Sequence, residues 1–109
     1  MKTYVCDIDG TICESKDGDY KKSTPIQSRI KKINELYNAG HTIIFHTARG
    51  MGRFSNAQAM AHAAFYDLTI KQLALWGVKY HSLFMGKPSG DCYIDDKGIS
   101  DEDFFNSGD

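Results

Sequence analysis

The residues that could do chemistry in this chain stand directly after short apolar segments. Asp7 and Asp9 follow the first such segment, and a second acidic pair, Asp95 and Asp96, follows the last. Carboxylates gathered in one place repel one another unless a cation or a proton compensates their charge. Oxygen ligands without clustered histidine or cysteine favour Mg²⁺, which usually retains water and accepts phosphate oxygens as further ligands. The acidic residues therefore indicate a magnesium site that handles phosphate.

A hydroxyl and an ammonium group complete this set. Thr47 ends the second apolar segment and Lys87 follows the third, and both side chains can bind the remaining oxygens of a phosphoryl group. Phosphoryl transfer depends mostly on positioning and charge stabilisation, to which one carboxylate can add nucleophilic attack and a second can add acid–base catalysis. The residue types thus predict an enzyme that works on phosphoryl groups.

The elements that must position these residues alternate between strands and helices. Apolar or β-prone runs predict four strands, over residues 3–8, 42–45, 81–85 and 92–94. Helical segments between strands imply parallel pairing, as in a βαβ unit. The alternation predicts an α/β fold, a Rossmann-like three-layer sandwich with a central parallel sheet. Open parallel sheets bind ligands beyond the carboxyl ends of their strands, which is where the polar residues fall.

A first helix is marked by an apolar stripe that runs from Ile26 to Tyr37 at helical spacing. We expect residues 23–25 to begin this helix with an N-cap and a first-turn proline, and Gly40 to end it. Residues 13–24 before it lack a period and are predicted to form a loop.

Further helices are predicted in the second half of the chain. Residues 56–66 are rich in alanine, and Thr69 is expected to cap a separate helix that stops at Gly77. Ser100 and Asp103 have the spacing of a capping box for a short last helix. Helices therefore separate most of the expected strands.

Four segments in this order resemble the motifs of the haloacid dehalogenase (HAD) superfamily of phosphohydrolases: TYVCDIDGTI, IIFHTARG, MGKPSG and CYIDDKGI. They match a strand followed by DxDGT, a strand ending in threonine, a lysine, and a strand ending in an acidic pair. The resemblance spans nearly the whole chain and implies a HAD core without a cap domain, because residues 12–24 are too few to form one. Within the superfamily, the chain looks most like small phosphatases of capsule or lipopolysaccharide sugar biosynthesis.

The resemblance implies roles for the four aspartates. Asp7 would attack phosphorus in line and form an aspartyl-phosphate, and Asp9 would protonate the leaving oxygen and then deprotonate the hydrolytic water. Mg²⁺ would be bound by the Asp7 carboxylate, the Asp9 main-chain carbonyl and one aspartate of the last pair. We favour Asp96 as the direct ligand, with Asp95 behind it.

The resemblance also implies contacts to the phosphoryl group and the substrate. Thr47 and Lys87 would hold phosphoryl oxygens, and Lys87 would balance the charge of Asp7. The further substrate-binding candidates are Gly10, Thr11, Ala48 and Arg49. For Arg49, a structural ion pair explains the residue nearly as well.

Several other residues admit two interpretations. One group forms either a lip that touches the substrate or a solvated loop: Asp17, Gly18, Asp19, Tyr20, Lys21 and Lys22. His46 and His81 lack the spacing of metal ligands and either pack, face solvent or line the mouth of the site. The three cysteines, Cys6, Cys13 and Cys92, are interpreted as free structural thiols.

Composition limits the remaining possibilities. The chain has 109 residues, 41% of them hydrophobic and 25% charged, which predicts one compact domain over residues 1–109. A net charge of −1 offers no basic track, so nucleic acid is not an expected partner. No apolar run approaches the ~18 residues of a membrane helix, and the N-terminus does not read as a signal peptide. We therefore expect a cytoplasmic protein without a membrane partner.

These features predict a Mg²⁺-dependent phosphomonoesterase that acts through an aspartyl-phosphate on a small phosphorylated metabolite such as a sugar phosphate. One alternative is a capless phosphatase of nucleic-acid ends or phosphoproteins, and another is a non-enzymatic phospho-receiver domain. A receiver would carry its phosphorylated aspartate after the third strand, where this chain has Met85, Gly86 and Lys87. A second copy of the chain is a further candidate partner, as a homo-oligomer that covers the open site.

Overall fold

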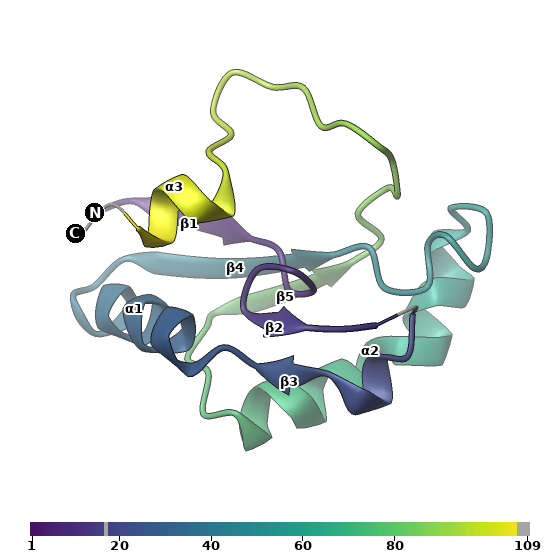
Figure 1. Ribbon diagram of the computed structural model, residues 1–109, viewed down its shortest axis with the longest axis horizontal. Helices are drawn as coiled ribbons and strands as arrows, with labels where there is room; N and C mark the ends of the chain where they lie inside the picture. Colours follow the sequence, from purple (N-terminus) through teal and green to yellow (C-terminus); the bar gives the residue numbers. More distant parts are fainter. Residues whose placement is uncertain (17, 107–109) are drawn as a thin grey trace.

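A parallel sheet of three strands forms the centre of the computed structural model, which describes residues 1–16 and 18–106. The strands β1 (Thr3–Cys6), β4 (Thr42–Thr47) and β5 (Ser82–Met85) lie in the order β1-β4-β5 (Figure 1). Both strand pairs are parallel, so the three carboxyl ends lie at one edge of the sheet. The α/β class with a central parallel sheet is confirmed.

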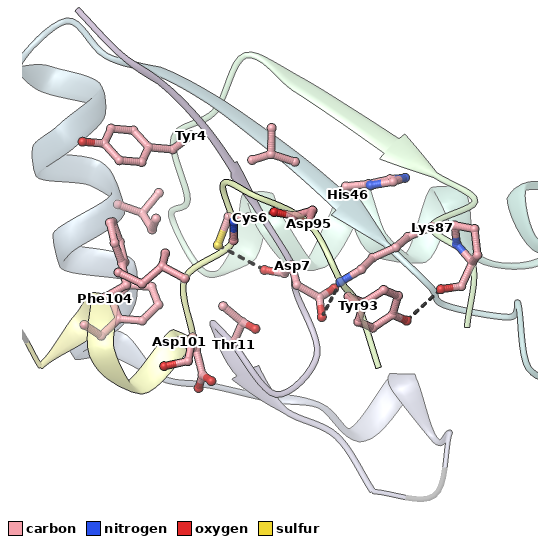
Figure 2. A pocket seen from close by; sticks show the side chains of 17 residues that line it. Tyr4, Cys6, Asp7, Thr11, His46, Lys87, Tyr93, Asp95, Asp101 and Phe104 are labelled. Carbon is pink, nitrogen blue, oxygen red and sulfur yellow. Dashed lines mark hydrogen bonds and ion pairs between the residues drawn. The ribbon is translucent and has the colours of Figure 1, made fainter. Parts of the chain in front are cut away.

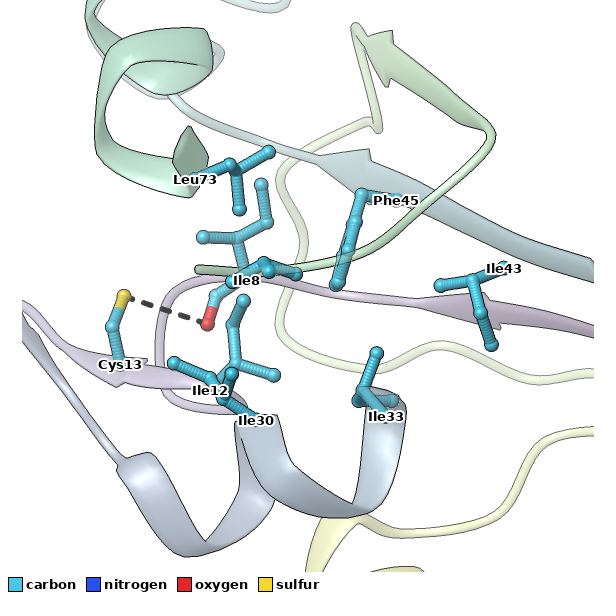
Figure 3. Packing of buried hydrophobic residues seen from close by; sticks show 9 residues of the cluster. Ile8, Ile12, Cys13, Ile30, Ile33, Ile43, Phe45 and Leu73 are labelled. Atoms are coloured by element: carbon cyan, nitrogen blue, oxygen red, sulfur yellow. Dashed lines mark hydrogen bonds between the residues drawn. The ribbon is translucent and has the colours of Figure 1, made fainter. Parts of the chain in front are cut away.

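The two long helices pack on the same face of this sheet. Helix α1 (Gln27–Asn38) connects β1 to β4, and α2 (Gln58–Leu75) connects β4 to β5. Ile43 and Phe45 are fully buried and alternate along β4 with less buried residues, so they share one face. Ile30 and Ile33 of α1 and Leu73 of α2 belong to the same cluster (Figure 3). The core therefore lies between the sheet and these helices. Burial of each such side chain stabilises the fold by about 1.5–3 kcal/mol.

Helices α1 and α2 leave the opposite face of the sheet largely open. Val5 and Phe84 lie on this face, because they pair with Ile44 and His46, and they are 64% and 55% exposed. Residues 86–100 form an irregular segment on this side, leading from β5 to the short helix α3 (Asp101–Phe105) (Figure 1). The predicted three-layer sandwich thus has helices on one face and an irregular segment on the other.

The fourth predicted strand, Cys92–Ile94, does not form. Residues 88–100 are exposed throughout, and Ile94 is 92% exposed. Local hydrogen bonds curl this segment: the Tyr93 hydroxyl donates to the Pro88 carbonyl over 2.7 Å, and the Asp95 carboxylate accepts from the Lys97 amide over 2.7 Å. A three-residue apolar run does not offer enough pairing to outweigh such bonds, so β1 pairs only with β4 in the described residues.

The helix boundaries differ from the sequence prediction in two places. Residues 58–75 form one helix, and Thr69 does not cap a second one, because its hydroxyl donates to the Phe65 carbonyl one turn earlier over 2.8 Å. Helix α1 begins after Ile26 without a side-chain cap, since Pro25 belongs to the short strand β3 (Thr24–Pro25). None of the helices in the described residues combines the length and apolarity that a membrane span requires.

Other local predictions are confirmed. Gly40 follows the last turn of α1 with a φ of +99°, the left-handed conformation that favours glycine. The Ser100 hydroxyl accepts the Asp103 amide over 3.2 Å and caps α3. The loop predicted over residues 13–24 is confirmed only in part, because the strand β2 (Cys13–Glu14) pairs antiparallel with β3 there and Tyr20–Lys22 form the 3₁₀ helix η1.

Candidate active site

Two cavities meet at Asp7, the residue that follows β1. The first, which we call the sheet cavity, has a volume of about 820 Å³ and lies between β1 and residues 86–100, with His46, Lys87 and Asp95 in its lining (Figure 2). The second, which we call the loop cavity, has a volume of about 440 Å³. It is lined by Asp7, Asp9, Gly18, Tyr20, Ala48, Arg49, Gly52, Arg53 and Ser89. Asp7 is thus accessible from both sides.

The Asp7 carboxylate is partly buried and faces an ammonium group. Lys87 Nζ lies 3.6 Å from Asp7 Oδ2, as Figure 2 shows. Burial raises the pKa of Asp7 above its ordinary value, while a hydrogen bond from the Ile8 amide and the charge of Lys87 oppose this rise. A desolvated carboxylate with a cationic neighbour is a suitable nucleophile for a phosphorus atom.

Lys87 is held in place from two sides. Its amide donates to the carbonyl of Thr47, the last residue of β4, over 3.0 Å. Its ammonium group lies 4.3 Å from the centre of the Tyr93 ring, a cation–π contact. The amino group is therefore fixed beside Asp7.

Asp9 is held by a buried arginine. Arg49 Nε and Nη2 donate to the two carboxylate oxygens of Asp9 over 2.9 and 3.0 Å, and Arg49 is only 1% exposed. The other terminal nitrogen, Nη1, donates to Thr69 Oγ1 and Gln72 Oε1 on α2, over 3.1 and 2.5 Å. Ser15 donates a further hydrogen bond to Asp9 over 2.5 Å. Of the two interpretations of Arg49, the structure shows the ion pair, which fixes the orientation of Asp9.

The two aspartates of the acidic pair, Asp95 and Asp96, differ in whether they line a cavity. Asp95 lines the sheet cavity with Asp7, whereas Asp96 is exposed and lines neither cavity. In residues 1–16 and 18–106, no three His, Cys, Asp or Glu side chains are grouped closely enough to hold a metal ion. Mg²⁺ is commonly held by one or two carboxylates, with water and phosphate oxygens as the other ligands. The donor types of the Asp7, Asp95 and Asp96 carboxylates fit this ion, and of the last pair only Asp95 shares a cavity with Asp7.

Comparison with known proteins bears on the fold. No family model matches the chain, and no curated protein matches its sequence. A solved structural-genomics target from Vibrio cholerae is 26% identical over 96% of this chain and 88% of that chain, with a TM-score of 0.88. The chain has a HAD-type fold. The predicted resemblance is thereby confirmed at the level of the fold. In the described part of the loop between β1 and α1, residues 12–16 and 18–25, the only elements are β2, η1 and β3, rather than a cap.

Two more solved structures share the HAD-type fold at lower identity. The D,D-heptose 1,7-bisphosphate phosphatase from B. bronchiseptica, complexed with magnesium and phosphate, is 24% identical over 84% of this chain and 52% of that chain, with a TM-score of 0.55. The Pnkp1/Rnl/Hen1 RNA repair complex is 16% identical over 97% of this chain and 30% of that chain, with a TM-score of 0.58. The present chain spans about half or less of these two proteins.

The other predicted site residues of the HAD-type core are placed as follows. Thr47 is fully buried and lines neither cavity, and its hydroxyl accepts the Arg49 amide over 3.2 Å. It therefore braces the turn after β4 instead of facing the cavities. Ala48 lines the loop cavity and Thr11 lines the sheet cavity. Gly10 lines neither, but its φ of +78° allows the sharp turn after β1.

The loop after β1 contributes to the site in part. Gly18 and Tyr20 line the loop cavity, and the Tyr20 carbonyl accepts a hydrogen bond from the Gln72 side chain over 2.6 Å. Lys21 and Lys22 are exposed and line neither cavity. Asp17 lies outside the described residues, and Asp19 contacts Lys22 at 3.8 Å. In the described part of the loop, Gly18 and Tyr20 therefore border the loop cavity, while Lys21 and Lys22 face solvent.

The two histidines differ in their surroundings. His46 lines the sheet cavity, where burial and the nearby charge of Lys87 lower its pKa. His81 stacks on Tyr37 with ring centres 4.6 Å apart, and its Nδ1 accepts the Ile43 amide over 3.1 Å. His46 therefore faces the site, and His81 is structural.

The cysteine thiols near the site are protonated groups of the interior. Burial raises the pKa of Cys6 to about 12 and that of Cys13 to about 11, with the neighbouring aspartates adding to both effects. Neither thiol is therefore a nucleophile at neutral pH, while Cys92 is exposed.

Sequence reasoning missed two residues of the site. Arg53 lines the loop cavity and Tyr93 lines the sheet cavity. Tyr93 was expected in a strand, so its contact with Lys87 could not be foreseen. The four-residue spacing between Arg49 and Arg53 in the loop after β4 was the available signal for the second arginine.

Proposed function

We propose that this chain is a phosphomonoesterase in which Asp7 is the nucleophile. The observation that carries the proposal is the position of Asp7, which lines both cavities, is partly desolvated and lies 3.6 Å from Lys87 Nζ. A phosphoryl group at this position has a carboxylate to attack it and an ammonium group to bind its oxygens. The HAD-type fold, shared with a heptose bisphosphate phosphatase, supports the same reaction.

The reaction has two steps on this chain's residues. An oxygen of Asp7 attacks phosphorus, the bond from phosphorus to the ester oxygen breaks, and Asp9 gives a proton to the departing oxygen. Asp9 then takes a proton from water, which attacks the aspartyl-phosphate and releases inorganic phosphate. The Arg49 fork holds Asp9 in one orientation for both transfers. Mg²⁺, when bound, supplies positive charge that offsets the charge of the phosphoryl oxygens.

The cavities favour a small substrate. The loop cavity, about 440 Å³, falls in the range of about 300–1,000 Å³ that is typical of small-molecule sites. The net charge of −1 gives no overall attraction to a polynucleotide, whose binding depends on neutralising its phosphates with positive charge. A small phosphorylated metabolite, such as a sugar phosphate, is therefore the proposed substrate class.

The test is phosphate release by the purified protein with Mg²⁺, from p-nitrophenyl phosphate and a panel of phosphorylated sugars, sugar acids and one oligonucleotide with a terminal phosphate. Asp7→Asn should abolish release, because an amide does not attack phosphorus, while its circular dichroism spectrum stays that of the wild type. Asp67→Asn is the matched control, since Asp67 is exposed on α2 and lines neither cavity. Release by Asp7→Asn at the wild-type rate would refute the proposed nucleophile.

A further inference from the structure

The arginine that holds Asp9 is itself held by helix α2. Arg49 Nη1 donates to Thr69 Oγ1 over 3.1 Å and to Gln72 Oε1 over 2.5 Å, and both acceptor residues are buried. The other two nitrogens, Nε and Nη2, donate to the Asp9 carboxylate. Because the guanidinium is planar, its bonds to α2 fix the direction of the fork that Asp9 meets. The orientation of Asp9 therefore depends on residues of α2 that line neither cavity.

Gln72 is the residue of α2 that joins this fork to the loop after β1. Its Oε1 accepts from Arg49, while its Nε2 donates to the Tyr20 carbonyl over 2.6 Å. The guanidinium offers only donors and the carbonyl only an acceptor, so the two partners determine which way the amide points. A side chain at this position must therefore accept and donate at once, which a methionine of nearly equal size cannot do.

The loop after β1 packs on the same guanidinium. The carbon of the Arg49 guanidinium lies 5.0 Å from the centre of the Tyr20 ring, a cation–π contact. Ser23, near the end of this loop, accepts a longer bond of 3.4 Å from Nη2. Tyr20 also lines the loop cavity together with Asp9. The contacts of Gln72 thus fix both the acid–base residue and part of the wall of the cavity in which that residue acts.

From these contacts we propose that Gln72 is a positioning residue for the proton transfers of Asp9, and that it acts through the Arg49 fork. The inference rests on the proposed phosphatase function and adds to it a residue outside both cavities. A proton donor must lie within hydrogen-bond reach of the oxygen that it protonates, so a fork that turns moves Asp9 away from the departing oxygen. Loss of the Gln72 amide therefore slows a reaction that needs this proton and spares one that does not.

The test varies how much the departing oxygen needs a proton. p-Nitrophenol is a much stronger acid than benzyl alcohol, so p-nitrophenyl phosphate needs little help from a proton donor, whereas benzyl phosphate, which is of similar size, depends on one. The measured quantity is kcat/KM for p-nitrophenyl phosphate divided by kcat/KM for benzyl phosphate, which we call the leaving-group ratio. We expect Gln72→Met to raise this ratio about tenfold, part of the roughly 10²–10⁴-fold that general acid–base catalysis typically supplies. Asp9→Asn removes the proton donor itself and should raise the ratio by at least as much.

Control variants separate positioning from a loss of stability. Gln72→Met nearly conserves volume and leaves Nη1 its bond to Thr69, so the variant should fold. Gln72→Ala is the second variant at this position and should shift the ratio in the same direction. Ile43→Val removes a buried methyl group near the opposite end of β4. It should lower the urea midpoint, but its leaving-group ratio should equal that of the wild type.

The possible outcomes distinguish the inference from the function on which it rests. A wild-type leaving-group ratio in a folded Gln72 variant, or an equal rise in Ile43→Val, would overturn the inference and leave the proposed function standing. A wild-type ratio in Asp9→Asn would overturn the role of Asp9, and the inference with it. Absence of Asp7-dependent hydrolysis of p-nitrophenyl phosphate would overturn the proposed function itself.

Discussion

Replacing Arg49 by methionine should destabilise the protein more than any other single change at the site. The methionine preserves much of the side-chain length but removes every donor of the guanidinium. Asp9 would lose both hydrogen bonds that Arg49 makes to it, and Gln72 Oε1 would lose its bond from Nη1. Thr69 keeps its bond to the Phe65 carbonyl, so its hydroxyl retains a partner.

The magnitude follows from the burial of the pair. Removing one partner of a buried ion pair typically costs 3–5 kcal/mol, because the other charge stays in the interior without compensation. Arg49 is fully buried on its side chain, whereas the Asp9 side chain is 23% exposed and keeps some contact with water. We therefore expect Arg49→Met to lower the free energy of unfolding by about 3–4 kcal/mol, a large part of the 5–15 kcal/mol that is typical of a domain.

Urea unfolding followed by circular dichroism measures this loss. With an m-value of about 1.5 kcal/mol/M, the midpoint should fall by roughly 2–3 M. Lys22→Met is the control, because Lys22 contacts Asp19 at 3.8 Å but is 85% exposed, and its loss should cost less than about 0.5 kcal/mol. A fall of less than about 0.5 M for Arg49→Met would refute the reasoning, since the interior would then not depend on the pair. The double variant with Asp9→Asn should show a coupling energy well above 0.5 kcal/mol.

Three more predictions concern the acid limb, the metal and the backbone of the site. Lys87→Met removes a positive charge that lowers the pKa of Asp7, so the pKa of Asp7 should rise. Because Asp7 must be ionised to attack, the acid limb of the pH profile of kcat/KM should move to higher pH. An acid limb that does not move would contradict the pairing of Lys87 with Asp7. Asp95→Asn should weaken the rise in Tm that Mg²⁺ produces, whereas Asp96→Asn should not, and the opposite order would restore Asp96 as the ligand. Gly50→Ala should lower the free energy of unfolding by about 1–3 kcal/mol, since it adds strain at a φ of +80° and a contact of 2.7 Å with a ring of α2; a urea midpoint equal to that of the wild type would contradict this.

Local patterns predicted most of the regular elements. The stripe from Ile26 to Tyr37 identified α1, because a helix with one apolar side repeats every three or four residues. The short apolar run at residues 92–94 was predicted to form a strand. That prediction was wrong, because a strand also needs a neighbouring strand with which to pair. The helix over residues 58–75 was divided at Thr69, because a threonine can cap a helix or bond back within one, and its sequence does not distinguish the two.

The sequence by itself determined that Asp7, Asp9 and Lys87 would gather at one edge of the sheet, because parallel strands place their carboxyl ends together and each residue follows a strand. Only the tertiary structure decided what each neighbouring side chain does there. Arg49 turned out to be a buried partner of Asp9, whereas Arg53, four residues later, is exposed and lines the loop cavity. Burial and pairing depend on where α2 and the loop after β1 pack, which are contacts between segments distant in the sequence, and no local spacing records them.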